Sequence, residues 1–196
     1  MRGMREHILP PVAAASAYSR ESLDARLTHL IDPALRDRPR VLIGMGGIET
    51  QLAYDQWPEQ EALTLLVANQ QHLPTCGFVD RGILNADALC TQADLVFTDL
   101  LSCCDVVICK PGYGTFVEAA LINIPVLYVE REDWPEQRVL VTWLESNARC
   151  ARLEPEALLR GDFDKAITAL LKQPAKAPIP QDGAMVAAAE ILHWLN

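Results

Sequence analysis

The chain has 196 residues, of which half are hydrophobic and 22% are charged, so it can bury one substantial core and fits a single domain. Its net charge of −9 argues against a protein that wraps nucleic acid or coats an anionic membrane by electrostatics. Binding of one nucleotide through a few directed backbone amides remains compatible with that charge. No apolar run reaches the roughly 18 residues that a membrane span needs.

The six cysteines form no C-x-x-C pair and have no ligand-like spacing with histidine. A chain with this much core does not need a disulfide framework, so free and mostly buried thiols in a reducing compartment are expected. The first 17 residues have faint signal-peptide features, but Pro10 and Pro11 interrupt their apolar stretch. A cytoplasmic location is therefore predicted.

The first half of the chain alternates short apolar runs with polar and glycine-rich connections. Gly46 and Gly47 directly follow the first apolar run, as expected where a buried strand enters a glycine loop. The expected elements are a helix over 22–31, a strand over 41–45, a helix over 48–57, a strand over 62–68 and a short strand near 78–79.

The second half shows a clearer alternation. The pattern predicts a helix from 98 to 101, a strand over 105–109, a loop over 110–114 and a helix over 115–121. It then predicts a strand over 125–129, a helix over 135–145, a strand over 148–153, a helix over 163–172 and an amphipathic closing helix beyond residue 183.

Strands that are apolar throughout and alternate with helices indicate a doubly wound parallel α/β sheet with helices on both faces. The chain then divides into an N-terminal connector with a short helix (1–39), a Rossmann-like domain (40–171), and a Pro/Ala-rich connector with a closing helix packed on the domain (172–196).

Two glycine loops are expected at the carboxyl edge of this sheet, where ligands of such folds bind. Gly44, Gly46 and Gly47 follow the first strand, and Gly112 and Gly114 follow a central one. Neither loop completes G-x-G-x-x-G, and no G-x-x-x-x-G-K-[ST] occurs, so the sequence gives little support to NAD or a P-loop nucleotide.

Thr115 and Glu118 form a T-x-x-E pattern that allows two interpretations. In a capping box, the Thr115 hydroxyl accepts from the amide of residue 118 while Glu118 reaches back. In a ligand site, Thr115 contacts a phosphate and Glu118 accepts hydrogen bonds from the two hydroxyls of a ribose. One residue can serve both purposes.

The stretch 105–129, DVVICKPGYGTFVEAALINIPVLYV, resembles the donor-binding signature of the twin-Rossmann (GT-B) nucleotide-sugar glycosyltransferases. The resemblance is strongest to the branch that includes the peptidoglycan N-acetylglucosaminyl transferase. Asn123-Ile124-Pro125 stands where that family has G-x-P, and Glu136-Gln137 is similar to its acidic-Gln pair.

The resemblance implies that Glu118 binds the ribose, that Thr115 and the amides of Gly112, Tyr113 and Gly114 bind the diphosphate, and that Glu136 and Gln137 bind the sugar. Gly46 and Gly47 would be the family's first glycine loop. Lys110 either helps to neutralise the diphosphate or is a solvated lysine, and Tyr113 either stacks on a base or sugar or packs on its own helix. A UDP-sugar is the expected ligand, with no cofactor and no metal.

The resemblance covers residues 40–195 and thus only the donor-binding half of a GT-B architecture. In that family a further domain holds the acceptor and usually the catalytic base, so no catalytic residue is assigned here. Hexosyl transfer would need that domain or a partner subunit. The alternative is a stand-alone, non-catalytic nucleotide-sugar binding or self-associating module.

Overall fold

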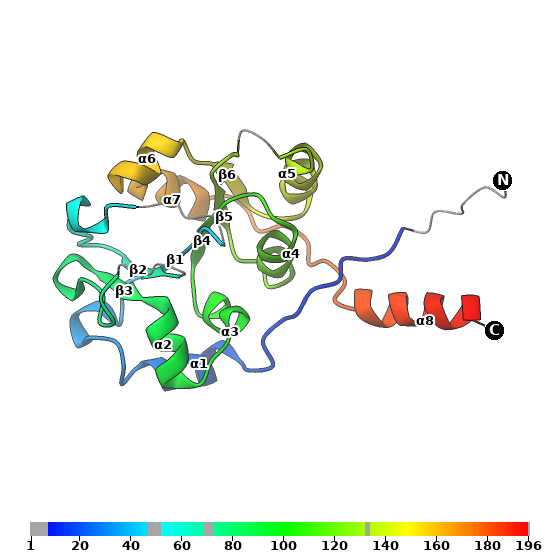
Figure 1. Ribbon diagram of the computed structural model, residues 1–196, viewed down its shortest axis with the longest axis horizontal. Coiled ribbons are helices and arrows are strands. Elements are labelled where there is room, and N and C mark those ends of the chain that lie inside the picture. Colours follow the sequence, from blue (N-terminus) through cyan, green and yellow to red (C-terminus); the bar gives the residue numbers. More distant parts are fainter. Residues whose placement is uncertain (1–7, 47–51, 69–72, 132–133, 196) are drawn as a thin grey trace.

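A computed structural model describes residues 8–46, 52–68, 73–131 and 134–195, and it shows a six-stranded sheet (Figure 1). The strand order is β3-β2-β1-β4-β5-β6, and every neighbouring pair is parallel. The predicted doubly wound α/β fold is confirmed. The strands are β1 (Arg40–Gly44), β2 (Thr64–Val67), β3 (Ile83–Asn85), β4 (Val106–Cys109), β5 (Val126–Tyr128) and β6 (Cys150–Arg152).

Helices cover both faces of the sheet. One face carries α1 (Arg20–Leu27), α2 (Ala86–Ala93), α3 (Phe97–Ser102), α4 (Tyr113–Leu121) and α5 (Gln137–Asn147). The other face carries α6 (Pro155–Arg160), α7 (Asp164–Leu171) and the 3-10 helix η2 (Tyr54–Gln56). Two further 3-10 helices, η1 (Pro33–Leu35) and η3 (Val79–Arg81), lie in connections, and α8 (Gly183–Leu195) projects from the body (Figure 1).

The two core layers follow from the two-residue period of a strand. Leu42 and Val107 point into the layer beneath α1 to α5, whereas Val41, Ile43 and Val106 point into the layer beneath α6 and α7. Apart from Arg40 at the start of β1, the two central strands β1 and β4 are therefore apolar at every position, which is the pattern of a parallel sheet covered on both sides.

Some predicted elements differ in the structure. Of the helix expected over 48–57, residues 48–51 lie outside the described part, and the remainder forms only the single turn η2. Trp57 is buried there in edge-to-face contact with Tyr54 and Phe163, so its packing ends the turn. The strand expected near 78–79 is a single bridge from Phe78 to Ile83, where β3 begins.

The helix of the predicted N-terminal connector belongs to the core. Leu23 and Leu27 of α1 are fully buried in the same layer as Phe116 of α4. Residue 39 is therefore not a boundary of the folded unit.

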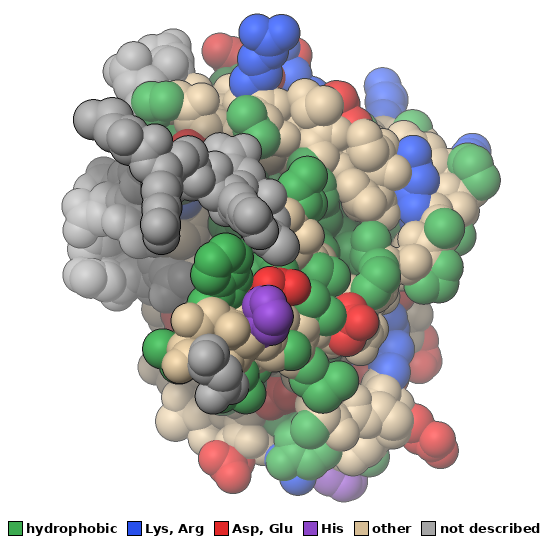
Figure 2. Space-filling view, turned by 90° about the vertical axis from the view of Figure 1, so that its right-hand side faces the viewer, with side chains coloured by type: hydrophobic (Ala, Val, Ile, Leu, Met, Phe, Trp, Pro, Cys, Tyr) green, Lys and Arg blue, Asp and Glu red, His purple; other side chains and the backbone are tan. Residues whose placement is uncertain are grey.

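The expectation that the closing helix packs on the domain is wrong, since Gly183 is its only buried residue among 183–195. Met185 and Leu195 are 74% and 77% exposed, and hydrophobic side chains lie at the surface of this end of the molecule (Figure 2). The helix is apolar nearly all round and not along one stripe, so it does not present a single face to the domain. Within the described residues, no helix is long and apolar enough to cross a membrane.

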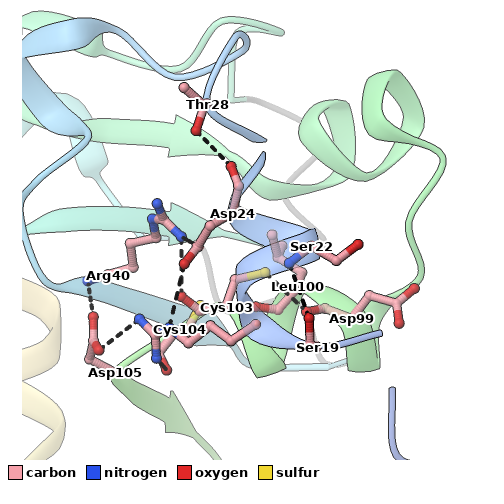
Figure 3. A network of polar contacts seen from close by, with 11 residues as sticks. Ser19, Ser22, Asp24, Thr28, Arg40, Asp99, Leu100, Cys103, Cys104 and Asp105 are labelled. Carbon is pink, nitrogen blue, oxygen red and sulfur yellow. Dashed lines mark hydrogen bonds and ion pairs between the residues drawn. The ribbon is translucent and has the colours of Figure 1, made fainter. Parts of the chain in front are cut away.

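A polar network joins α1, β1 and β4 at the amino edge of the sheet (Figure 3). The Asp105 carboxylate accepts from the Arg40 backbone N–H at 2.8 Å and from the Arg20 guanidinium at 2.9 Å. The Arg40 guanidinium pairs with Asp24 and donates to the Cys103 carbonyl at 3.4 Å. Because Arg40 is only 8% exposed, its charge is held away from water and depends on these partners.

Replacement of Asp105 tests this network. Asp105→Ala should lower the free energy of unfolding by about 2 kcal/mol, because the Arg40 N–H and the Arg20 guanidinium lose a charged acceptor. Urea denaturation measures the change, with Asp37→Ala, at an exposed turn position, as the matched control. Equal unfolding midpoints for the two variants would show that the network contributes nothing.

Candidate functional site

Strands β1 and β4 are neighbours in the middle of the sheet, and the chain leaves them toward opposite edges. In doubly wound folds this switch point opens a crevice at the carboxyl ends of the strands. Gly46 follows β1 and Lys110 directly follows β4. Gly46 has φ +63°, and a Cβ placed on it would lie 3.2 Å from Lys110 Cε, so the two residues are adjacent.

The second glycine loop forms the start of α4. Gly112 is the N-cap residue, and the first N–H bonded within the helix is that of Phe116, which donates to the Gly112 carbonyl at 3.2 Å. The N–H groups of Tyr113, Gly114 and Thr115 therefore have no acceptor within the helix, and they carry its partial positive charge. Both features suit an anion.

The space beside Gly114 is open, since a Cβ placed there meets no atom within 4 Å. A glycine near the start of a helix lowers helix stability relative to alanine. Packing against the rest of the protein does not require it at this position. Close approach of a ligand to the backbone would require it.

The capping-box interpretation of Thr115 and Glu118 is wrong. The helix begins at Tyr113, two residues earlier than predicted, so Thr115 already lies inside the first turn. The N-cap of α4 has no side-chain hydrogen bond. The early start follows from Gly112, whose extended backbone lets the chain enter the helix directly after it.

Glu118 is half-buried, and no described residue forms a hydrogen bond or an ion pair with its carboxylate. Burial raises the pKa of this carboxyl above its usual value, because the charged form loses hydration and gains no compensating partner. Such a group is costly for the fold and is available to a ligand.

The Tyr113 hydroxyl is bonded to the N-terminal segment. The residue is 49% exposed, and its hydroxyl accepts from the Val12 N–H at 2.9 Å and donates to the Val12 carbonyl at 3.1 Å. The side chain thus ties the start of α4 to the N-terminal segment.

Glu136 and Gln137 lie where α5 begins, and α5 packs beside α4. The Gln137 side-chain oxygen accepts from the Arg131 backbone N–H at 2.7 Å, and Glu136 accepts from the Trp134 indole at 3.4 Å. Both side chains therefore organise the connection that follows β5. Gly47, the other predicted residue of the first loop, lies outside the described residues.

Arg131 belongs to none of the motifs found in the sequence, yet the structure places it close to Lys110. The pKa of Lys110 lies below its usual value because of partial burial and the nearby positive charge of Arg131. The signal in the sequence is slight, since a basic residue three positions after a strand is common at protein surfaces. Across the described ranges, no group of three or more His, Cys, Asp or Glu side chains is arranged to hold a metal ion.

Comparison with known proteins supports the fold. No protein-family model matches the chain, and no curated protein matches it. Among solved structures, the chain is similar to the spinosyn forosaminyltransferase SpnP, with a TM-score of 0.51 and 19% identity over 94% of this chain and 44% of that one. It is also similar to the glycosyltransferase SnogD from Streptomyces nogalater, with a TM-score of 0.43 and 18% identity over 91% of this chain and 48% of that one.

The chain therefore has a Rossmann-like α/β fold similar to part of the SpnP structure. It spans less than half the length of either similar structure.

The unpaired carboxylate predicts how stability depends on pH. Because the pKa of Glu118 is raised in the folded state, its neutral form favours folding, and this contribution is lost as pH rises from the unfolded pKa through the folded one. Glu118→Gln should therefore be at least as stable as the wild type at pH 7 and should lack this part of the pH dependence.

Urea denaturation at pH 4.5 and pH 7 measures both effects, and Glu61→Gln, at an exposed position, is the control. A Glu118→Gln protein that is less stable than the wild type at pH 7 would mean that the carboxylate makes a stabilising contact after all.

Proposed function

We propose that this chain is the donor-binding part of a glycosyltransferase and that it binds a nucleotide-sugar, a UDP-sugar in the first instance. The observation that carries the proposal is Glu118, a half-buried carboxylate that lacks a partner among the described residues and lies on α4, the helix that follows β4 at the switch point of the sheet. The 2′ and 3′ hydroxyls of a ribose would supply two donors to its oxygens.

The other residues take roles consistent with their places. The free amides of Tyr113, Gly114 and Thr115 would bind the diphosphate, with the Thr115 hydroxyl as a further donor and Gly112 shaping the loop. Gly46 lets the chain after β1 pass close to Lys110. Glu136 and Gln137 would bind hydroxyls of the sugar from the start of α5.

In hexosyl transfer the negative charge that develops on the leaving diphosphate would be stabilised by amides already oriented before the reaction. The acceptor and the catalytic base would come from a further domain or a partner subunit. Free thiols at all six cysteines fit a reducing, cytoplasmic compartment.

A second candidate is a nucleotide-sugar binding or self-associating module without catalysis. One observation favours it: apolar residues of α8 such as Met185 and Ile191 are exposed. Transfer of a hexose by this chain mixed with candidate partner domains, and its absence without them, would favour the first candidate.

Binding of UDP tests the role of Glu118. Glu118→Gln should weaken UDP binding by about 10- to 100-fold, because a hydrogen bond to a charged acceptor contributes roughly 1.5–3 kcal/mol. Calorimetry on the wild type, Glu118→Gln and the Glu61→Gln control measures the effect. Absence of UDP binding by the wild type, or equal affinities for all three proteins, would contradict the proposal.

Gly114 gives an independent test in which stability and binding change in opposite directions. Gly114→Ala should raise the free energy of unfolding by about 0.5–1 kcal/mol, since alanine favours the helix and the added methyl meets no neighbouring atom. The same methyl should weaken UDP binding by occupying the space beside the amides. A stabilised variant with unchanged UDP affinity would show that the diphosphate does not lie there.

A further inference from the structure

A cavity of about 210 Å³ opens at the carboxyl ends of β1, β4 and β5, beside α6. Met45, Val129 and Leu158 form apolar walls, and three charged residues, Lys110, Glu130 and Arg131, also line it. The cavity therefore lies at the same sheet edge as the start of α4, on the side of α6.

The charges of the cavity do not cancel. Glu130 is paired with Arg152, whose Nε lies 3.1 Å from its carboxylate. Within the described residues, no carboxylate lies within ion-pair distance of Lys110 or Arg131. The two positive charges of Lys110 and Arg131 therefore share the cavity with one carboxylate, and that carboxylate is already paired with Arg152.

Two contacts hold Arg131 in place, and the backbone of Gly46 leaves room for Lys110. The Arg131 guanidinium lies over the Trp134 ring, 3.9 Å from its centroid, and the Arg131 backbone N–H is bonded to Gln137. The Lys110 side chain passes beside Gly46, where an added Cβ would lie 3.2 Å from Lys110 Cε. Partial burial, together with the repulsion from Arg131, lowers the pKa of Lys110, so an anion bound between the two cations would stabilise the charged form of Lys110.

We propose that Lys110 and Arg131 together bind the diphosphate group of the ligand in this cavity, with Arg131 as a residue that distinguishes diphosphates from uncharged nucleosides. The inference rests on the proposed function, because it assigns a further contact within the same site. A guanidinium presents two parallel donors to phosphoryl oxygens, and the ammonium adds a second charge. A diphosphate carries enough negative charge to engage both and the free amides of α4.

Inorganic pyrophosphate separates this inference from the proposed function, because it carries the diphosphate without the nucleoside. Calorimetry would compare the wild type with Lys110→Met, Arg131→Met and the double variant. Arg160→Gln, at an exposed position on α6, is the matched control. Each single variant should weaken pyrophosphate binding by about 10- to 100-fold, the range for hydrogen bonds between charged groups. The double variant should weaken pyrophosphate binding by less than the product of the two single fold-changes, since both side chains bind the same anion.

Uridine and UDP complete the design. Arg131→Met should weaken UDP binding and leave uridine binding unchanged, whereas Glu118→Gln should weaken both. Arg131→Lys keeps the charge but loses the paired donors, so its affinity for UDP should lie between those of the wild type and Arg131→Met. Urea denaturation of each variant confirms that it is folded.

The outcomes distinguish the two proposals. Failure of pyrophosphate to bind the wild type, or equal pyrophosphate affinities for the wild type, Lys110→Met and Arg131→Met, would overturn the inference even if Glu118→Gln weakens UDP binding. The converse outcome is pyrophosphate binding that depends on Lys110 and Arg131, while UDP binds no more tightly than pyrophosphate and its affinity does not change in Glu118→Gln. That outcome would support the cation pair and overturn the nucleotide-sugar proposal.

Discussion

The parallel pairing of β1 with β4 is the constraint on which the rest of the structure depends. At the amino edge, Asp105 bonds to the Arg40 backbone, and the Arg40 guanidinium joins β1 to α1 (Figure 3). The register between the strands places Gly44 opposite Cys109 at the other end of this pair. At the carboxyl edge the same register brings Gly46 beside Lys110. The geometry of a site formed by two segments far apart in sequence thus depends on the hydrogen-bonded pairing of two buried strands.

Much of this fold could be predicted from the sequence because the central strands are continuous apolar runs, which are typical of a parallel sheet covered on both faces. The elements that the sequence does not reveal, β3, α2 and α6, are short and have no such run. Their positions depend on tertiary contacts and on turns such as the one at Gly82, whose φ is +72°. The predicted start of α4 is two residues late, because Thr115 suggests a side-chain cap, whereas the helix begins after Gly112 with no side-chain cap. Arg131 could not be identified as a candidate site residue from the sequence, since its proposed role depends on its proximity to Lys110, 21 residues earlier in the chain.

The candidate site gathers groups that do little for the stability of the fold. Gly114 forgoes the helix preference of alanine, Glu118 keeps a poorly hydrated charge, and Lys110 lies near a second cation. Each of these is unfavourable by itself, and a single ligand with a diphosphate and a ribose would relieve the last two. At this edge of the sheet, residues that would favour ligand binding therefore lower the stability of the fold, as expected for a binding site that is preorganised in the absence of its ligand.

The N-terminal segment lies against the starts of both α4 and α8. The Tyr113 hydroxyl bonds to the backbone of Val12, and a Cβ on Gly183 would collide with the Pro11 carbonyl. On the segment's side these contacts use main-chain atoms, which nearly every residue type supplies, while the 43% exposed Val12 side chain takes no part in the hydrogen bonds. Over evolutionary time, Val12 should therefore vary freely among related chains, whereas Tyr113 and Gly183 should persist together or be lost together.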